Sequence, residues 1–204
     1  MGYTDINLYF LINSESSIEG AEVYNKYLDG WRICWESEDS YRHWCLLEQV
    51  SNVDIVLIVM LNPGSLKSDG RDIKKDTTLR ILREVFDNTG FSPLVVNLFD
   101  FSTTSPTILF SNWNKKDSKN LIYSRLDFTN IKAVLYAYGD YQNRKVEGPD
   151  IIKRIEFVKK HFSDIPEILI PTNKSDTPKH PMAWQRERLK SKVKESIVNF
   201  QRQS

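Results

Sequence analysis

The chain has 204 residues, of which 40% are hydrophobic and 27% charged, and its formal net charge is +1. These values are typical of one globular domain that buries a core, and they argue against a disordered or fibrous chain. The near-neutral total excludes a protein that is basic throughout, although it permits a local basic face.

We predict a single domain over residues 1–204, with an aromatic-rich N-terminal extension over residues 1–50. Three elements are expected in this extension: a strand at 9–12, a helix over 18–28 and a strand over 31–35. Four large aromatic side chains also gather there: Trp31, Trp35, Tyr41 and Trp44. Such density is typical of a core or a packed lid, and less often of a stacking surface.

The pattern becomes clearer from residue 53. Val53 to Leu61 is a continuous apolar run, typical of a strand buried on both faces, as in a parallel sheet. Further strands are expected at 94–97, 131–138 and 167–170, and helices at 76–90, 118–127, 150–162 and from 184 to the C-terminus. Alternating strands and helices predict an α/β fold, here a three-layer α/β/α sandwich around a four-stranded, mostly parallel central sheet.

In such a sheet, ligands bind beyond the carboxyl ends of the strands. We therefore expect the four segments that follow the strands to converge: 62–65, 97–100, 139–141 and 178–181. Each holds polar or conformationally permissive residues directly after an apolar strand. This expected convergence is the main functional signal in the sequence.

Familiar catalytic motifs are missing from the sequence. The absence of GxxxxGK[ST], GxGxxG, HExxH and GxSxG patterns argues against nucleotide triphosphate hydrolysis, a nicotinamide cofactor and a zinc protease. We expect no cofactor and no metal. The strand ends offer asparagine instead, which has both a donor and an acceptor, and histidine, which can stabilise an oxygen that becomes negative.

The two cysteines, Cys34 and Cys45, form no CxxC pair, and His43 adds no zinc spacing. Two reduced buried thiols in a cytoplasmic protein are favoured over a disulfide. The longest apolar run, residues 55–61, is too short to span a bilayer, and the acidic N-terminus does not resemble a signal peptide. We therefore predict a cytoplasmic protein with no membrane partner.

The strand-end motifs, in their order, resemble those of the uracil-DNA glycosylase superfamily. Four stretches carry this resemblance: Met60-Leu61-Asn62-Pro63-Gly64 (the Asn-type loop of the mismatch-specific branch), Leu94-Val95-Val96-Asn97, Tyr136-Ala137-Tyr138-Gly139 and His180-Pro181-Met182. The chain is also similar to an uncharacterised bacterial and phage family with an L-N-P-S-x-A, D-P-T-x-R, V-N-L-F and H-P pattern. Together the two resemblances cover roughly residues 40–185.

The resemblance implies a DNA glycosylase-like hydrolase that flips a base into a pocket and hydrolyses its glycosidic bond with water. By this resemblance Asn62 positions the water, Asn97 binds the edge of the base, and His180 stabilises charge on the departing base. Further substrate contacts are expected from Gly64, Ser65, Asp76, Arg80, Phe99 and Gly139. The implied partner is DNA or a nucleotide, and the oligomeric state is left open.

The sequence departs from the superfamily pattern in three places. Asn62 stands where the most active branch has aspartate, and the last loop lacks the serine and second proline of H-P-S-P. The aromatic residue that usually follows the first loop and stacks on the base is not evident after Gly64. A second hypothesis therefore stays open, a catalytically inactive module that binds nucleic acid or a nucleotide. Asp100 and Asp140 are candidate water activators in place of Asn62.

Three charged stretches have two interpretations each. The segment Ser65 to Arg71, with Lys67 and Ser68, is either a solvated loop or a phosphate contact. Asp76 and Arg80 are either an i,i+4 surface pair or part of the site. The tail from residue 184 has a solvated charged face or a nucleic-acid contact; its charged residues are Arg186, Glu187, Arg188, Lys190, Lys192, Lys194, Glu195 and Arg202.

Overall fold

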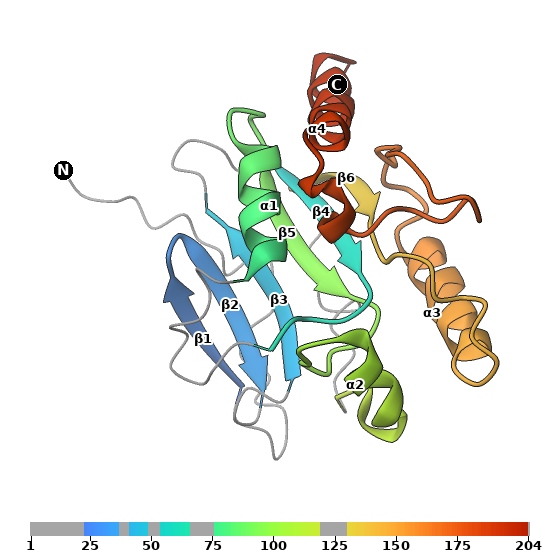
Figure 1. Cartoon of the computed structure of the whole chain (residues 1–204). Helices are drawn as coiled ribbons and strands as arrows, with labels where there is room; N and C mark the ends of the chain where they lie inside the picture. The colour runs from blue at the N-terminus through green and yellow to red at the C-terminus, as the bar shows by residue number, and fades with distance from the viewer. Residues whose placement is uncertain (1–22, 37–40, 49–53, 66–75, 119–129, 204) are drawn as a thin grey trace.

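The computed structural model describes residues 23–36, 41–48, 54–65, 76–118 and 130–203 (Figure 1). Its six strands are β1 (Val23–Leu28), β2 (Trp31–Glu36), β3 (Tyr41–Leu47), β4 (Ile55–Met60), β5 (Ser92–Asn97) and β6 (Ile131–Tyr136). Its helices are α1 (Thr77–Phe86), α2 (Pro106–Ser111), α3 (Gly148–His161) and α4 (Glu187–Gln203), with 3-10 turns at Trp113–Lys115 and Pro181–Gln185. In these described segments, no helix is long and apolar enough to cross a membrane.

The six strands form one mixed sheet in the order β1-β2-β3-β5-β4-β6. β1, β2, β3 and β5 pair antiparallel, whereas β4 pairs parallel with both β5 and β6. The α/β class is therefore confirmed, but the prediction of a four-stranded, mostly parallel sheet is wrong. The difference arises because β1, β2 and β3 extend the parallel half of the sheet as an antiparallel meander.

The predicted helix over residues 18–28 is wrong in its described part, because residues 23–28 form β1. The reason is the turn that follows. Asp29 (φ 49°) and Gly30 (φ 81°) both have positive φ and connect paired Leu28 and Trp31, as in a two-residue hairpin turn. The strand predicted at 31–35 is confirmed as β2, and β3 was not predicted. The strand predicted at 9–12 lies outside the described residues.

Helices pack against both faces of the sheet. Val56, Ile58 and Met60 of β4 lie in a cluster with apolar residues of α1 and α4, and the alternate residues of β4 lie in a second cluster with α2 and α3. Every residue of β4 is buried, which confirms a strand covered on both faces. Trp31 and Trp35 are each 1% exposed, so they belong to the core.

Helices α1, α3 and α4 agree with the predicted periodicity, whereas the strand predicted at 167–170 does not form. Glu167 makes only an isolated parallel bridge to Val134, and Leu169 is 76% exposed. Pro166 and Pro171 flank this short stretch and lack the backbone N–H that a ladder needs, which limits it to a single bridge. Most of the helix predicted at 118–127 lies outside the described residues.

Candidate functional site

The segments that follow β4 and β5 lie side by side. Leu98 N donates to Met60 O (2.7 Å), and Thr103 N donates to Pro63 O (3.0 Å). Ser65 N returns a hydrogen bond to Thr103 O (3.0 Å). The two loops thus continue the parallel pairing of their strands beyond the sheet.

The segment after β6 meets the segment that ends at His180. Gly139 N donates to Pro178 O (3.1 Å), and a Cβ on Gly139 would lie 3.6 Å from His180 Cβ. Gly139 has φ +84°, a conformation that favours glycine. Tyr141 contacts Phe110 with ring centroids 5.5 Å apart, so the segment after β6 packs against α2, the helix that follows the loop after β5.

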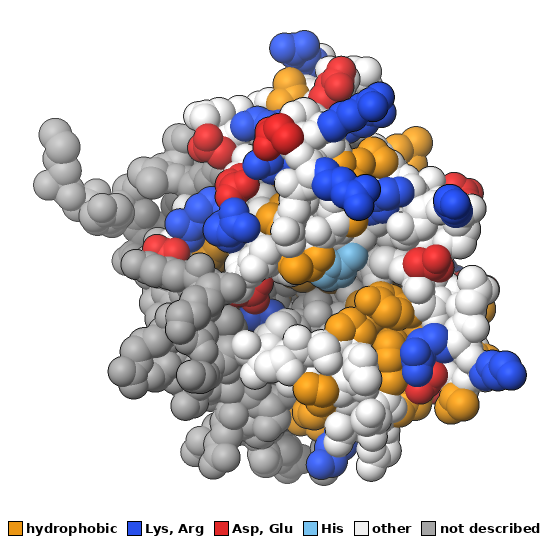
Figure 2. Space-filling view, viewed as in Figure 1, with side chains coloured by type: hydrophobic (Ala, Val, Ile, Leu, Met, Phe, Trp, Pro, Cys, Tyr) orange, Lys and Arg blue, Asp and Glu red, His pale blue; other side chains and the backbone are white. Residues whose placement is uncertain are grey.

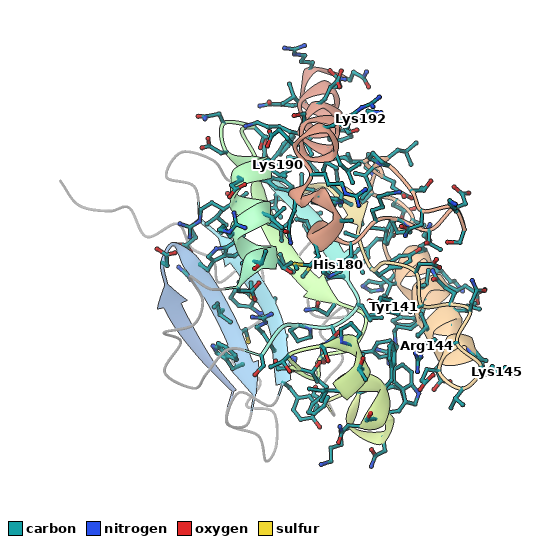
Figure 3. All side chains as sticks on the ribbon, in the orientation of Figure 1. Tyr141, Arg144, Lys145, His180, Lys190 and Lys192 are labelled. Atoms are coloured by element: carbon teal, nitrogen blue, oxygen red, sulfur yellow. The ribbon has the colours of Figure 1, made fainter. Side chains whose placement is uncertain are left out.

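His180 is half-buried, and its labelled position in Figure 3 corresponds to the histidine beside a hollow in Figure 2, which has the same orientation. Its Nδ1 accepts a hydrogen bond from Met182 N (3.2 Å) and caps the following 3-10 turn. Because Nδ1 is an acceptor, the ring hydrogen of the neutral imidazole is on Nε2. Burial lowers the pKa of His180 to about 4, against a smaller opposing effect of Asp76. At neutral pH the ring is therefore an uncharged donor.

Asp76 lies at the start of α1 and forms a buried ion pair. Its Oδ1 accepts from Leu79 N (3.0 Å), and its Oδ2 lies 3.9 Å from Arg42 Nη1. The Arg42 side chain is 2% exposed, and its Nε and Nη1 make no hydrogen bond within the described residues. A Cβ on Gly64 would lie 3.1 Å from Asp76 Oδ2, so glycine lets the loop after β4 approach the carboxylate closely.

Asn62 is half-buried and holds the paired loops together. Its Nδ2 donates to Thr103 Oγ1 (2.9 Å) and to Pro63 O (3.0 Å). Thr103 Oγ1 in turn donates to Ser105 O (2.9 Å). The donor end of the Asn62 amide is thus used inside the protein, which leaves Oδ1 as the atom that can accept from a ligand or a water.

Asn97 and Phe99 lie deeper than the sequence predicts. Asn97 ends β5 opposite Met60 and is 2% exposed. Phe99 is 1% exposed and packs edge-on against Trp113, with ring centroids 4.8 Å apart, while the Arg154 guanidinium lies 5.2 Å from its centroid. Phe99 is therefore a core residue.

Arg80 and Ser65 lie at the surface. Arg80 is 53% exposed and pairs at 2.6 Å with Glu84, one turn further along α1. The predicted surface pair between Asp76 and Arg80 is therefore wrong, because Asp76 pairs with Arg42 instead. Ser65 is exposed at the end of the described part of its loop. Lys67, Ser68 and Arg71 lie outside the described residues.

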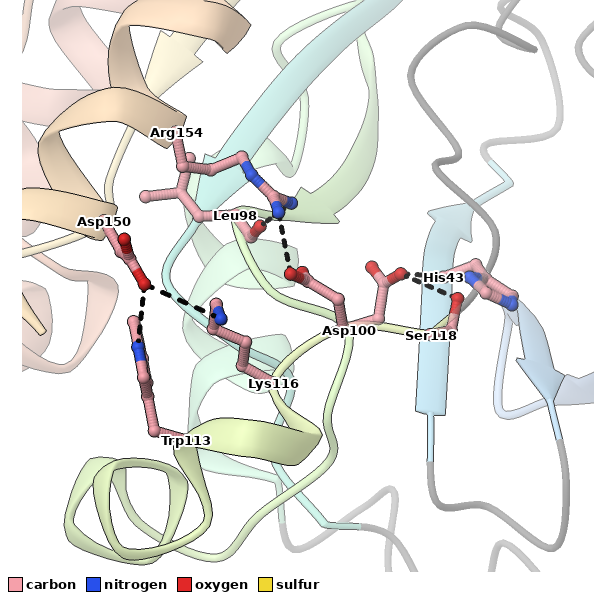
Figure 4. A network of polar contacts seen from close by, with 9 residues as sticks. His43, Leu98, Asp100, Trp113, Lys116, Ser118, Asp150 and Arg154 are labelled. Atoms are coloured by element: carbon pink, nitrogen blue, oxygen red, sulfur yellow. Dashed lines mark hydrogen bonds and ion pairs between the residues drawn. The ribbon is translucent and has the colours of Figure 1, made fainter.

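The two aspartates considered as water activators are differently placed. Asp100 is buried, with Oδ2 3.5 Å from His43 Nδ1 and 3.3 Å from Ser118 Oγ (Figure 4). Burial raises the pKa of Asp100, against the smaller opposing effect of His43. Asp140 is exposed. Asp100 therefore braces its loop against β3 and does not face a ligand site.

Sequence reasoning missed Arg42 and Thr103. Arg42 lies within a strand that otherwise buries apolar and aromatic side chains, and a lone charge in such a run is a signal for a buried ion pair. Thr103 carries no comparable signal, because its contact to Asn62 depends on the pairing of two distant loops.

The basic tail forms α4, in which Lys190 contacts Glu84 at 3.0 Å and Glu187 at 3.1 Å. These hydrogen bonds raise the pKa of Lys190. Its charge is thus partly compensated by neighbours within the protein.

Comparison with known families finds a match to "Protein of unknown function (DUF1643)" over residues 41–182. No curated protein and no solved structure matches the chain. The matched span runs from β3 to the turn after His180, so it includes Arg42, Asn62, Asp76 and Asn97. Because the match covers more than half of the chain, the protein belongs to this family of unknown function.

Proposed function

We propose that the hollow beside His180 binds a nucleobase, and that the protein is a DNA glycosylase-like hydrolase with a uracil-DNA glycosylase-like sandwich fold. The observation that carries this proposal is a histidine whose Nδ1 accepts from Met182 N, which leaves Nε2 as the donor of the neutral ring. Its segment lies beside the segment that follows β6, at the carboxyl ends of parallel strands. This is the usual position of ligand sites in α/β sheets. Three of the four motifs that resemble the superfamily lie at the ends of β4, β5 and β6, and the fourth, at His180, lies beside the segment that follows β6.

The proposed reaction is hydrolysis of the bond between C1′ of the sugar and a ring nitrogen of the base. The base leaves with the bonding electron pair, and its carbonyl oxygen becomes negative. A hydrogen bond from His180 Nε2–H to this oxygen strengthens as the charge grows, which lowers the barrier. Water adds its oxygen to C1′, and its proton passes to solvent and then to the departed base. Asn62 Oδ1 accepts a hydrogen bond from this water.

A second candidate function is base binding without catalysis. It is favoured by the placement of two carboxylates, because Asp76 pairs with Arg42 and caps α1, while Asp100 is buried against His43. Neither carboxylate is placed as an exposed general base. An asparagine amide is a weak activator of water, so this candidate predicts salt-dependent binding without product.

The test is an assay for abasic sites with single- and double-stranded oligonucleotides that carry uracil, mismatched bases or modified bases. We expect base release from at least one substrate, and loss of it in the double variant Asn62→Ala, Asn97→Ala. The control is Lys132→Ala, because Lys132 pairs with Asp54 at the opposite end of the parallel strands. Release that persists in the double variant would refute the assigned site, and binding without release would favour the second candidate.

A further inference from the structure

Tyr141 and His180 both lie close to Gly139. A Cβ on Gly139 would lie 3.0 Å from Tyr141 Cε2 and 3.6 Å from His180 Cβ. A side chain at position 139 would therefore press on the tyrosine ring, so glycine leaves room for Tyr141 beside the Cβ of His180. Figure 3 shows Tyr141 next to His180, and Figure 2 shows hydrophobic side chains bordering the hollow on that side.

The Tyr141 ring packs against Phe110, which in turn contacts Arg144. Phe110 lies 5.5 Å away between ring centroids, at an interplanar angle of 53°. The Arg144 guanidinium lies 3.9 Å from the centroid of Phe110, and Glu147 holds Arg144 through a 2.8 Å ion pair. These contacts restrict the movement of the Tyr141 ring before any ligand binds, which lowers the entropic cost of binding.

The Tyr141 ring is also partly buried against the core. Its hydroxyl is uncharged at neutral pH, as in any tyrosine, and burial raises its pKa further. An uncharged aromatic surface of this kind suits a planar ligand better than an ionised phenolate would.

An aromatic ring beside a neutral N–H donor suits one chemical class of ligand. A planar heterocycle gains stacking or edge contact from the ring, and a carbonyl on that heterocycle accepts from His180 Nε2–H. The described part of the loop after β4, residues 61–65, contains no aromatic residue that could supply this surface.

We propose that Tyr141, braced by Phe110, is the aromatic wall against which a planar heterocycle with a ring carbonyl packs while His180 binds the carbonyl. This inference rests on the binding part of the proposed function and does not depend on hydrolysis. It assigns the specificity of the hollow to a residue after β6, and it applies equally to a free nucleotide and to a base within a strand.

The test is equilibrium binding of uridine and thymidine monophosphates, and of single-stranded five-nucleotide oligomers of the same bases, to the wild type and to variants of residue 141. Ligand-observed saturation-transfer spectra would show whether the base protons contact the protein. We expect Tyr141→Ala to weaken binding about tenfold or more, because stacking on an aromatic side chain is worth that much per base. Tyr141→Phe is expected to stay within about threefold of wild type, because it keeps the ring.

Phe157→Ala is the matched control, because Phe157 is an aromatic residue of α3 that is 47% exposed and stacks on His161. Wild-type affinity in Tyr141→Ala, a tenfold loss in Tyr141→Phe, or failure of the wild type to bind any of these probes would each overturn the proposal. If Tyr141→Ala does not fold, Tyr141→Leu is used in its place, because leucine keeps the side-chain bulk and lacks the aromatic ring. Tighter binding of oligomers than of monophosphates would identify a strand as the source of the base.

The two proposals fail in different ways. Tyr141-dependent binding without base release would refute the proposed hydrolysis and support the binding role of Tyr141. Base release that is unchanged in Tyr141→Ala would refute the wall and leave the hydrolase intact.

Discussion

Replacing Arg42 by methionine is expected to lower the free energy of unfolding by about 3 kcal/mol, as removal of one partner from a buried ion pair does. The two side chains are only 2% and 9% exposed, so Asp76 would keep a carboxylate with little access to water and no counter-charge. The loss can be measured by urea unfolding followed through tryptophan fluorescence, since Trp31 and Trp35 are buried in the same core cluster.

The double variant Arg42→Met, Asp76→Asn is expected to recover most of this loss. Asparagine caps a helix about as well as aspartate, so α1 keeps its hydrogen bond to Leu79 N while the unpaired charge disappears. Arg32→Met is the matched control, because Arg32 lies on neighbouring β2 and pairs with Glu48 at the surface, and we expect it to cost less than about 1 kcal/mol. A double variant as unstable as Arg42→Met would contradict this role of the ion pair.

Replacing His180 by alanine is expected to lower the rate of base release about 100-fold or more, the usual cost of removing one donor from a developing oxyanion. The same change removes the acceptor that caps the 3-10 turn at Pro181–Gln185, so the loss alone would not identify the donor. His180→Asn separates the two effects, because asparagine can accept from Met182 N but places no donor in the hollow at the position of Nε2.

We therefore expect His180→Asn to be as inactive as His180→Ala while unfolding at the wild-type denaturant concentration. The measurement is single-turnover base release at saturating enzyme, which isolates the chemical step. Activity of His180→Asn within about threefold of wild type would assign His180 to the turn and not to the reaction.

The parallel half of the fold could be predicted because its signals are local. β4 is a continuous apolar run that ends at Asn62-Pro63-Gly64, and Asp76 is an N-cap residue directly before an amphipathic helix. The antiparallel half could not be predicted in the same way. In β3, Arg42 and His43 are buried against acidic residues that come much later in the chain, and no local pattern shows which acidic residue each one meets.

In the candidate site, some residue positions could be predicted from the sequence, but their contacts could not. The positions of Asn62 and Asn97 follow from where strands end, which the hydrophobic pattern shows, whereas the strand predicted before His180 does not form. Their hydrogen bonds do not follow from that pattern. The Asn62 amide is fixed by Thr103 on another loop, and Tyr141 and His180 both lie close to Gly139, which adopts a positive φ.

His180 also contributes to the pH dependence of stability. The pKa of His180 is lowered in the folded state to about 4 from an ordinary value of 6.5. Between these values the unfolded chain binds the proton and the folded protein does not, so this group makes the folded state less stable as the pH falls from 6.5 towards 4. Above pH 6.5 both states are neutral and its contribution does not change with pH.

The central claim is that a neutral imidazole with its hydrogen on Nε2 borders the hollow. It is tested most directly by the nitrogen NMR spectrum of His180 in protein with labelled histidine, assigned with His180→Asn and recorded from pH 8 to pH 4. We predict a protonated Nε2 and an unprotonated Nδ1 through neutral pH, with charging only as the pH approaches the pKa of about 4. A His180 ring that becomes charged near pH 6.5, or that carries its hydrogen on Nδ1, would contradict the claim.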